Sequence, residues 1–279
     1  MCRSVFLSGK GAGAFCDDDL CALVGAVRFD VMSVRWLTVF FDLPAEALAT
    51  SCAFWQRVTG SSLSPPRGSR AEFATLIPEG GDAFLRVQRV DGDVSGHHLD
   101  VHVDEVDTFV SQALSLGAIA ADGPSPVPVL RSPAGLTFCV VGHHGEARRP
   151  PPLAWPGGHR SLVDQVCVDV PTRVFDGECD FWEALTGWEC RTGSRPEFRY
   201  LARPSRMPLR ILPQRVDGQD VDAATCHLDL ATSDVILERQ RHEALGATVL
   251  AEFPDWVTLR DPNGLAYCIT RRKPDTGTL

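Results

Sequence analysis

Hydrophobic and polar residues alternate in short runs through most of the chain, and two amphipathic stretches interrupt the alternation in each half. A period of two predicts strands that are buried on one face, whereas a period near 3.6 predicts helices. The elements predicted in the first half are, in order, a strand at 36–43, a helix from Pro44 to about Val58, a hairpin of strands at 72–77 and 83–90, a strand at 98–103, a helix at 105–116 and a strand at 136–141. This mixture predicts an α+β protein.

The same order of motifs occurs twice along the chain. Phe54-Trp55 recurs as Phe181-Trp182, and each pair is followed four residues later by Thr-Gly. Four further motifs recur in the same order: Gln88-Arg89-Val90-Asp91-Gly92 at 214–218, His98-Leu99-Asp100 as His227-Leu228-Asp229, Leu116-Gly117-Ala118 as Leu245-Gly246-Ala247, and Pro133, Gly135 and Cys139 as Pro262, Gly264 and Cys268. So many matches in one order indicate an internal duplication, in which the second half repeats the elements of the first.

A polar segment rich in proline and glycine, residues 143–160, separates the two halves and is typical of a linker. The predicted domains are therefore 33–142 and 161–271, with residues 272–279 as a tail. A coherent pattern begins only near Met32. Residues 1–32 are accordingly predicted to be a disordered leader, or to result from a start codon assigned too far upstream.

Charge and cysteine content narrow the classes of function. A net charge of -9 at pH 7 gives no sign of the clustered positive charge that binds nucleic acid or anionic membranes. No apolar run approaches the roughly 20 residues that span a bilayer, and residues 1–31 lack the basic start and apolar core of an export signal. The 10 cysteines are scattered singly, which favours reduced packing residues in a cytoplasmic protein.

The motif order, which ends in Asp261-Pro262-Asn263-Gly264, resembles the glyoxalase-like domains found in many actinobacterial proteins. These domains belong to the vicinal oxygen chelate superfamily, together with bleomycin resistance proteins and extradiol dioxygenases. The resemblance covers roughly residues 35–142 and 161–270. It implies two tandem domains, each of two βαβββ modules whose strands form an open, curled mixed sheet around a cavity for a small molecule.

In metal-dependent relatives, four strand positions that face this cavity carry His or Glu ligands. The resemblance places at these positions, in order, Thr38 and Gln165, Gln88 and Gln214, His98 and His227, and Cys139 and Cys268. One His, one weakly coordinating Gln and one Cys make a poor ligand set for a divalent metal, which has about three protein ligands in a catalytic site. No cofactor is therefore predicted, and an atypical metal site stays open as an alternative. The residues predicted to contact a ligand are Thr38, Gln88, Cys139, Gln165, Gln214 and Cys268.

Strand alternation places His98 and Asp100 on the cavity face of their strand, and it places His227 and Asp229 in the same way. A His acts as a general acid or base near neutral pH, and a nearby carboxylate orients it. These four residues are the predicted catalytic groups for a metal-free proton transfer or ring opening. The alternative is that each His and Asp only form hydrogen bonds within the sheet.

Two functions fit this set of residues. The first is binding of a small organic molecule without a divalent metal, as in the resistance proteins of the superfamily that sequester an antibiotic in the groove of a dimer. The duplication would then supply that dimer within one chain, so the protein is predicted to be a monomer. The second is an enzyme, either a lyase or isomerase that uses the His-Asp pairs, or a dioxygenase-type enzyme with an unusual metal site. A scaffold without a ligand is a third hypothesis, because the fold alone never determines the chemistry.

Overall fold

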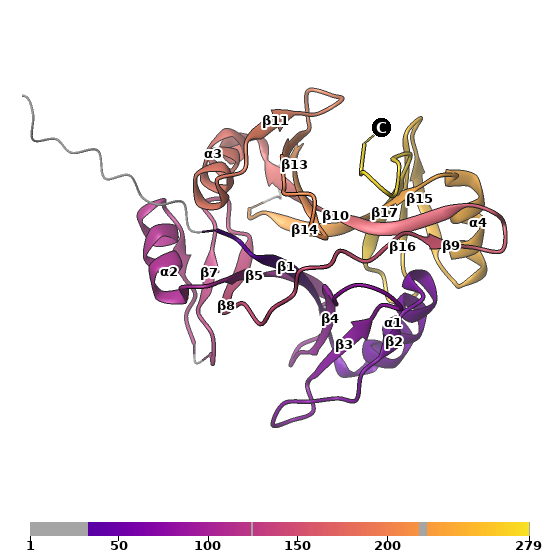
Figure 1. The fold of residues 1–279 in the computed structure, drawn as a ribbon, viewed down its shortest axis with the longest axis horizontal. Coiled ribbons are helices and arrows are strands. Elements are labelled where there is room, and N and C mark those ends of the chain that lie inside the picture. The colour runs from indigo at the N-terminus through magenta and orange to yellow at the C-terminus, as the bar shows by residue number, and fades with distance from the viewer. Residues whose placement is uncertain (1–32, 124, 218–221, 279) are drawn as a thin grey trace, which may run out of the picture. The chain divides into compact units, whose positions relative to one another are not determined.

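A computed structural model describes residues 33–123, 125–217 and 222–278 (Figure 1). The predicted leader, residues 1–32, lies outside the described residues. In the part of the chain that is described, no helix is both long and apolar enough to cross a membrane.

The first half forms one sheet of eight strands in the order β2-β3-β4-β1-β5-β8-β7-β6. Its elements are β1 (Trp36–Leu43), α1 (Ala45–Thr59), β2 (Ser62–Leu63), β3 (Phe73–Ile77), β4 (Leu85–Arg89), β5 (Gly96–Val103), α2 (Val106–Ser115), β6 (Ile119–Ala120), β7 (Val129–Arg131) and β8 (Thr137–Gly142). β1 and β5 pair antiparallel at the centre, and each has a parallel partner from its own module, β4 for β1 and β8 for β5. The sheet therefore consists of two βαβββ modules joined through their first strands.

The second half repeats this plan. Its elements are β9 (Leu153–Ala154), β10 (Arg160–Pro171), a 3-10 helix (Thr172–Val174), α3 (Phe175–Thr186), β11 (Cys190–Thr192), β12 (Arg199–Leu201), β13 (Arg210–Val216), β14 (Thr225–Thr232), α4 (Val235–Ala244), β15 (Thr248–Glu252), β16 (Trp256–Arg260) and β17 (Ala266–Thr270). The main sheet has the order β13-β10-β14-β17-β16-β15, with β9 paired to β10, and β11 and β12 form a separate pair. β10 and β14 take the central antiparallel place of β1 and β5.

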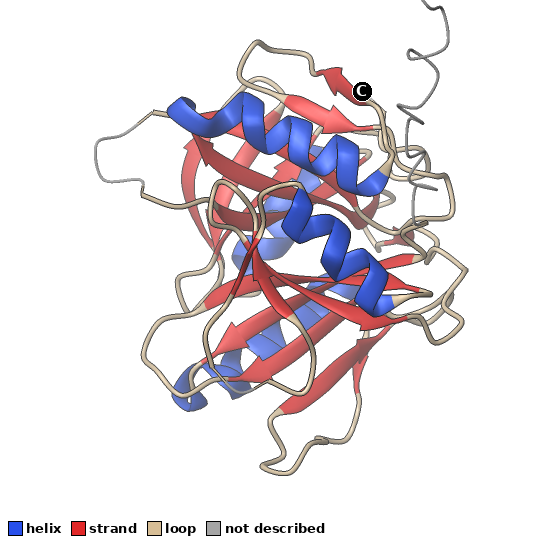
Figure 2. Ribbon diagram, turned by 90° about the vertical axis from the view of Figure 1, so that its left-hand side faces the viewer, coloured by secondary structure: helices blue, strands red, loops and turns tan. Residues whose placement is uncertain are grey.

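The predicted α+β class with curled mixed sheets is confirmed, and so is the predicted end of the first helix. Gly60 follows α1 with φ 60°, and Gly187 follows α3 with φ 69°. These left-handed conformations suit glycine, because a Cβ atom would clash with the backbone there. The helices lie against the sheets (Figure 2), and the helix-facing strand residues, such as Leu99 and Leu228, are almost fully buried.

Helices of one half pack on elements of the other half. Figure 1 shows α2 beside α3 at one end and α1 beside α4 at the other. Trp55 of α1 lies 5.2 Å from Tyr267 of β17 between ring centroids, and Phe138 of β8 lies 5.2 Å from Trp182 of α3. The apolar residues of both halves form one continuous buried cluster. The described residues therefore make one compact unit.

Candidate functional site

A cavity of about 340 Å³ lies in the second half. Its floor consists of alternate residues from neighbouring strands: Gln165 and Cys167 of β10, Arg210 and Gln214 of β13, His227 and Asp229 of β14, and Cys268 of β17. The residues between them on the same strands, such as Val166 and Leu228, are buried in the core. Phe198, Tyr200 and Trp256 add aromatic side chains to the lining. The alternation of the strands thus gives this sheet one apolar face and one polar face that lines a cavity.

His227 is the centre of the polar groups at this floor. Its Nδ1 lies 2.9 Å from Oδ2 of Asp169, a hydrogen bond between neighbouring strands. Its Nε2 lies 3.5 Å from Oδ1 of Asp229 and 3.6 Å from Sγ of Cys268. Cys167 is directly opposite His227 in the strand register, and its thiol donates to Oε1 of Gln214 at 3.3 Å.

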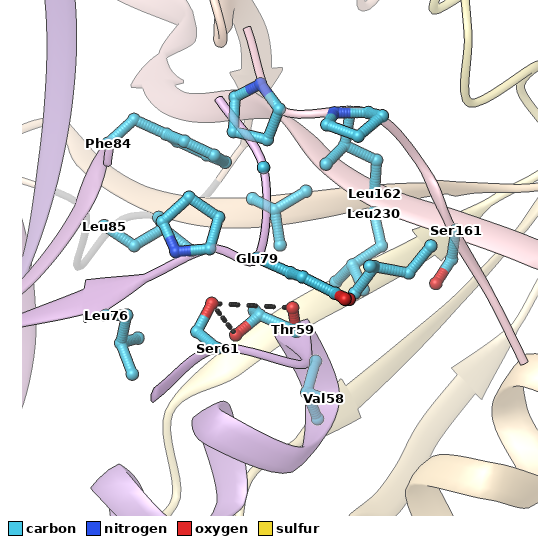
Figure 3. Close-up of a pocket in the computed structure, with 16 residues that line it drawn as sticks. Val58, Thr59, Ser61, Leu76, Glu79, Phe84, Leu85, Ser161, Leu162 and Leu230 are labelled. Carbon is cyan, nitrogen blue, oxygen red and sulfur yellow. Dashed lines mark hydrogen bonds between the residues drawn. The ribbon is translucent and has the colours of Figure 1, made fainter. Parts of the chain in front are cut away.

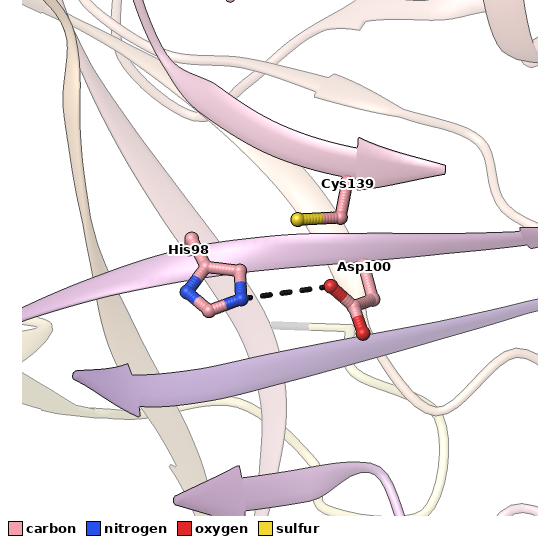
Figure 4. A group of neighbouring side chains, drawn as sticks. All are labelled: His98, Asp100 and Cys139. Atoms are coloured by element: carbon pink, nitrogen blue, oxygen red, sulfur yellow. Dashed lines mark ion pairs between the residues drawn. The ribbon is translucent and has the colours of Figure 1, made fainter. Parts of the chain in front are cut away.

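The first half contains the same arrangement at the equivalent positions. Nδ1 of His98 lies 2.7 Å from Oδ2 of Asp42, and its Nε2 lies 3.6 Å from Oδ1 of Asp100. Figure 4 shows how His98 and Asp100 of β5 converge with Cys139 of β8. The two halves differ at the residue opposite the His in the strand register. In the first half this residue is Phe40, in the position of Cys167, and its ring stacks on the His98 ring with 4.7 Å between the centroids. None of these residues lines the 340 Å³ cavity.

The strand register explains why each His has two carboxylates nearby. Asp42 lies on β1 two positions from the residue opposite His98, and Asp169 lies in the same place relative to His227. Analysis of the single strands identified only Asp100 and Asp229 and missed the two carboxylates that form the short hydrogen bonds. A signal for them is present, because each half has an Asp two residues before a proline, at Asp42-Leu43-Pro44 and Asp169-Val170-Pro171.

The other residues predicted from the resemblance occupy different surroundings in the two halves. Gln165 donates to Oδ2 of Asp229 and accepts a hydrogen bond from Nε of Arg210 at 2.7 Å. Its counterpart Thr38 is fully buried and bonds to Nε2 of His102 at 2.9 Å. Gln88 pairs in register with Asp42, outside the His98 cluster. Of these residues, only those of the second half line the cavity.

The electrostatics of the two clusters favour a positive charge at the central His. Burial by itself would lower the pKa of His98, but the hydrogen bond to Asp42 raises it to about 10. Burial also opposes the charge on His227, yet Cys167 and the hydrogen bond to Asp169 outweigh it and raise its pKa well above 6.5. Burial raises the pKa of the Asp100 and Asp229 carboxyls. Each His therefore lies in a negative local potential.

The C-terminal segment contributes to the lining of the cavity. Arg272 forms two hydrogen bonds of 2.7 and 2.9 Å to the carboxylate of Asp164, and both side chains are buried. Asp164 lies at an irregularity of β10. Gly277 has φ +72° and packs so closely on Asp164 that a Cβ there would lie 2.8 Å from its carboxylate. This contact brings Gly277 and Thr278 into the lining, a role that the sequence pattern of the tail does not indicate.

A second cavity of about 170 Å³ lies between the two halves, beside the end of α1 (Figure 3). Leu76, Phe84, Leu153 and Leu162 are among its mostly apolar lining, and Glu79 is the one titratable residue in it. It contains no His, Cys or Arg among its lining residues. The groups able to do chemistry therefore concentrate in the larger cavity.

Three donor types that bind transition metals meet at the floor of the larger cavity. The ligand atoms of His227, Asp229 and Cys268 all lie within 4.8 Å of one another, and those of His98, Asp100 and Cys139 do so in the first half. The resemblance supplied only the His and the Cys of each set. The structure adds a carboxylate, which brings the set in the second half to the three protein ligands that open metal sites use.

Comparison with known proteins supports the fold. A sequence model described as "Glyoxalase-like domain" matches residues 38–141 and 165–270. The fold is similar to 2,2',3-trihydroxybiphenyl 1,2-dioxygenase from Sphingomonas wittichii strain RW1, with 14% identity, a TM-score of 0.56 and coverage of 86% of this chain and 90% of that chain. An extradiol ring-cleaving dioxygenase from B. fuscum has 15% identity, a TM-score of 0.57 and coverage of 89% and 76%.

A third similar structure is a fusion of a xylose isomerase-like TIM barrel with 4-hydroxyphenylpyruvate dioxygenase. It has 12% identity and a TM-score of 0.56; the match covers 86% of this chain but only 49% of the fusion protein, about half of its length. No curated protein matches the sequence. Identities this low establish a shared fold and no shared activity.

Proposed function

The chain belongs to the family of glyoxalase-like domain proteins, and from this premise we propose that its second half binds a small organic anion in the 340 Å³ cavity. The volume lies within the range of about 300–1,000 Å³ that is usual for small-molecule sites. The lining combines aromatic side chains with a few polar groups, which is the composition such sites share.

The partly buried, unpaired charge of Arg210 supports an anionic ligand. Among the described residues no carboxylate pairs with it, and its Nε donates to the neutral amide oxygen of Gln165. Burial and the nearby charge of Arg272 lower the pKa of Arg210 to about 10. The carboxylates of Asp164 and Asp229 raise it, but they offset only part of the lost hydration. In contrast, Arg272 in the same lining is neutralised by Asp164. A carboxylate ligand would complete the charge balance of Arg210 with two parallel hydrogen bonds.

The remaining lining suits a flat apolar body attached to that anionic group. The Arg210 guanidinium lies 4.9 Å from the ring centroid of Tyr200. Trp256 lies 5.8 Å from Phe198 in an edge-to-face arrangement. These rings add apolar surface to the lining near the charged group, so an aromatic carboxylate fits the site better than a highly hydrated sugar acid.

Binding of benzoate derivatives and of the matched benzamides tests this proposal by calorimetry. We expect the carboxylates to bind at least about tenfold more tightly, or about 1.4 kcal/mol, and Arg210→Ala to abolish that difference. Arg191→Ala is the matched control, since it removes an exposed Arg that pairs with Glu189 in the same half. Equal affinity for acids and amides in the native protein would contradict an anionic ligand.

An enzyme that acts on the bound molecule is the second candidate, and the position of His227 at the cavity floor favours it. A lyase or isomerase would use His227 to donate a proton to the ligand, with Asp169 holding the ring. A dioxygenase-type reaction, as the names of the similar solved structures state for those proteins, would require a metal ion at His227. In either form, His227→Gln should abolish turnover but leave the affinity for the carboxylate within about threefold, because Arg210 provides the binding charge.

A further inference from the structure

Two distances in the cluster of His227, Asp229 and Cys268 match those between the ligand atoms of a metal ion. Nε2 of His227 lies 3.6 Å from Sγ of Cys268 and 3.5 Å from Oδ1 of Asp229. A tetrahedral ion with bond lengths of about 2.0–2.1 Å to nitrogen, 2.3 Å to sulfur and 2.0–2.2 Å to oxygen separates these atom pairs by about 3.6 and 3.4 Å. The distance from Nε2 to Oδ1 is long for a good hydrogen bond, whereas the distance from Nε2 to Sγ is within the range of a hydrogen bond to sulfur. Both distances from Nε2 therefore match those between two ligand atoms of one ion, and all three ligand atoms lie within 4.8 Å of one another.

Oδ1 of Asp229 is a polar atom of this cluster without a hydrogen-bond partner. It is buried and has no hydrogen-bond partner among the described residues. A buried carboxylate oxygen without a partner is costly, and such an exception in a folded protein calls for an ion or another bound group. The other oxygen of Asp229 is satisfied by Gln165, so the orphaned atom is the one directed at His227.

Each of the three side chains also contacts a further residue that orients it. Asp169 accepts from Nδ1 of His227, so Nε2 is the nitrogen that faces Asp229 and Cys268. Gln165 donates to the far oxygen of Asp229. The hydroxyl of Thr258 lies 3.5 Å from Sγ of Cys268. Outer contacts of this kind orient metal ligands and set the tautomer of a ligating His.

We propose that His227, Asp229 and Cys268 bind one divalent transition metal ion of the zinc type, with Asp169 as the orienting partner of the His. A thiolate and an imidazole select such ions over magnesium or calcium. The cavity beside Cys268 provides the open fourth position that a substrate or water takes in catalytic sites. The set differs from the one implied by the family resemblance, because the carboxylate comes from Asp229, two residues after the His on the same strand.

The proposal is independent of the anionic ligand, because Arg210 is not among the ligands. Loss of carboxylate affinity in Arg210→Ala with unchanged metal content would separate the two sites. Conversely, metal could be absent while the carboxylate still binds. Failure of one proposal is therefore distinguishable from failure of the other.

The test is titration of the full chain with Co²⁺ and Zn²⁺, followed by elemental analysis and by the absorption band that a thiolate-cobalt bond produces. We expect Cys268→Ser to lower the bound metal by about one equivalent per chain and to remove the band. Asp229→Asn and Asp169→Asn should weaken affinity, the latter about 10- to 100-fold. Cys167→Ser is the matched control, because its thiol lies in the same lining and bonds to Gln214.

Three results would overturn the site: no bound metal in the native protein, unchanged metal content in Cys268→Ser, or an equal loss in Cys167→Ser. If Cys268→Ser does not fold, the cobalt band of the native protein and the affinity of Asp229→Asn decide in its place. Unchanged affinity in Asp229→Asn would then reject the proposal.

Discussion

At the scale of single residues, the two central histidines owe their properties to a carboxylate on the neighbouring strand. Asp42 contacts Nδ1 of His98, and Asp169 contacts Nδ1 of His227. Alternation along a single strand predicts which face a residue occupies, and it correctly placed both histidines on the polar face. It cannot predict which residue lies beside it on the next strand, because that depends on register. The two aspartates were missed for this reason.

The pH dependence of stability should reveal the pairing of His98 with Asp42. The pKa of His98 is raised to about 10, so the stabilisation is complete below about pH 6.5 and is lost as the pH rises towards 10. Asp42→Asn should lower stability by roughly 1.5–3 kcal/mol below pH 6.5, as expected for a hydrogen bond to a charged group. The difference between the two proteins should shrink above pH 10 in urea unfolding curves.

The control for this comparison is Asp104→Asn, which removes an exposed aspartate that pairs with Arg35. Its effect should stay within about 0.5 kcal/mol at every pH, because exposed ion pairs contribute little. An NMR titration in which native His98 changes protonation near pH 6.5 would show that Asp42 does not stabilise its charge.

At the scale of elements, α4 links the second sheet to the first helix through one buried carboxylate. Glu238 accepts hydrogen bonds from His159 at 2.6 Å and from Ser161 at 2.7 Å. It also pairs with Arg241 at 2.7 Å. Arg241 in turn donates to the carbonyl oxygens of residues 57 and 58 at the end of α1, both at 3.0 Å. These helix-end carbonyls lack partners within their own helix, so the contact caps α1 from the other half.

Glu238→Gln should therefore destabilise the protein by about 3–5 kcal/mol, because Arg241 and His159 lose a buried partner. Burial would raise the pKa of Glu238, but hydrogen bonds to His242 and Arg241 hold it far below 4.5. Its stabilisation is present above pH 4.5 and is lost as the pH falls, so the variant should be less sensitive to acid. Thermal unfolding between about pH 6 and pH 2 measures this, because the loss begins only below pH 4.5. Glu243→Gln, a more exposed change on α4, should alter neither property appreciably.

At the scale of the whole molecule, the two repeats share one core although residues 143–160 separate them in the sequence. Periodicity identified the apolar face of each helix and thus the repeated modules. It gave no indication that α1 packs on β17 and α3 on β8, since an apolar face does not specify its partner. Trp55 is an example of a contact that the sequence pattern did not predict. Its ring lies in the shared core, and its Nε1 donates to Asp261 of the other half at 3.2 Å.

A single cooperative unfolding transition is the expected consequence of the shared core. Trp55→Ala and Trp182→Ala should each lower stability by about 3–5 kcal/mol, and each should move the entire transition in differential scanning calorimetry. Trp256→Ala, which removes a half-buried ring from the cavity lining, should have a smaller effect. Two resolved transitions, of which each core substitution moves only one, would show that the halves unfold independently.

Phe40 illustrates what a fused pair permits and two identical subunits do not. In a symmetric homodimer every mutation appears in both sites, so a residue that fills one cavity fills the other. Here Phe40 stacks on His98 while the matching position holds Cys167. The two halves of one chain can therefore diverge in function. The first half retains the His-Asp-Cys cluster beneath a packed ring, and the second half keeps a cavity in which a molecule can contact the cluster.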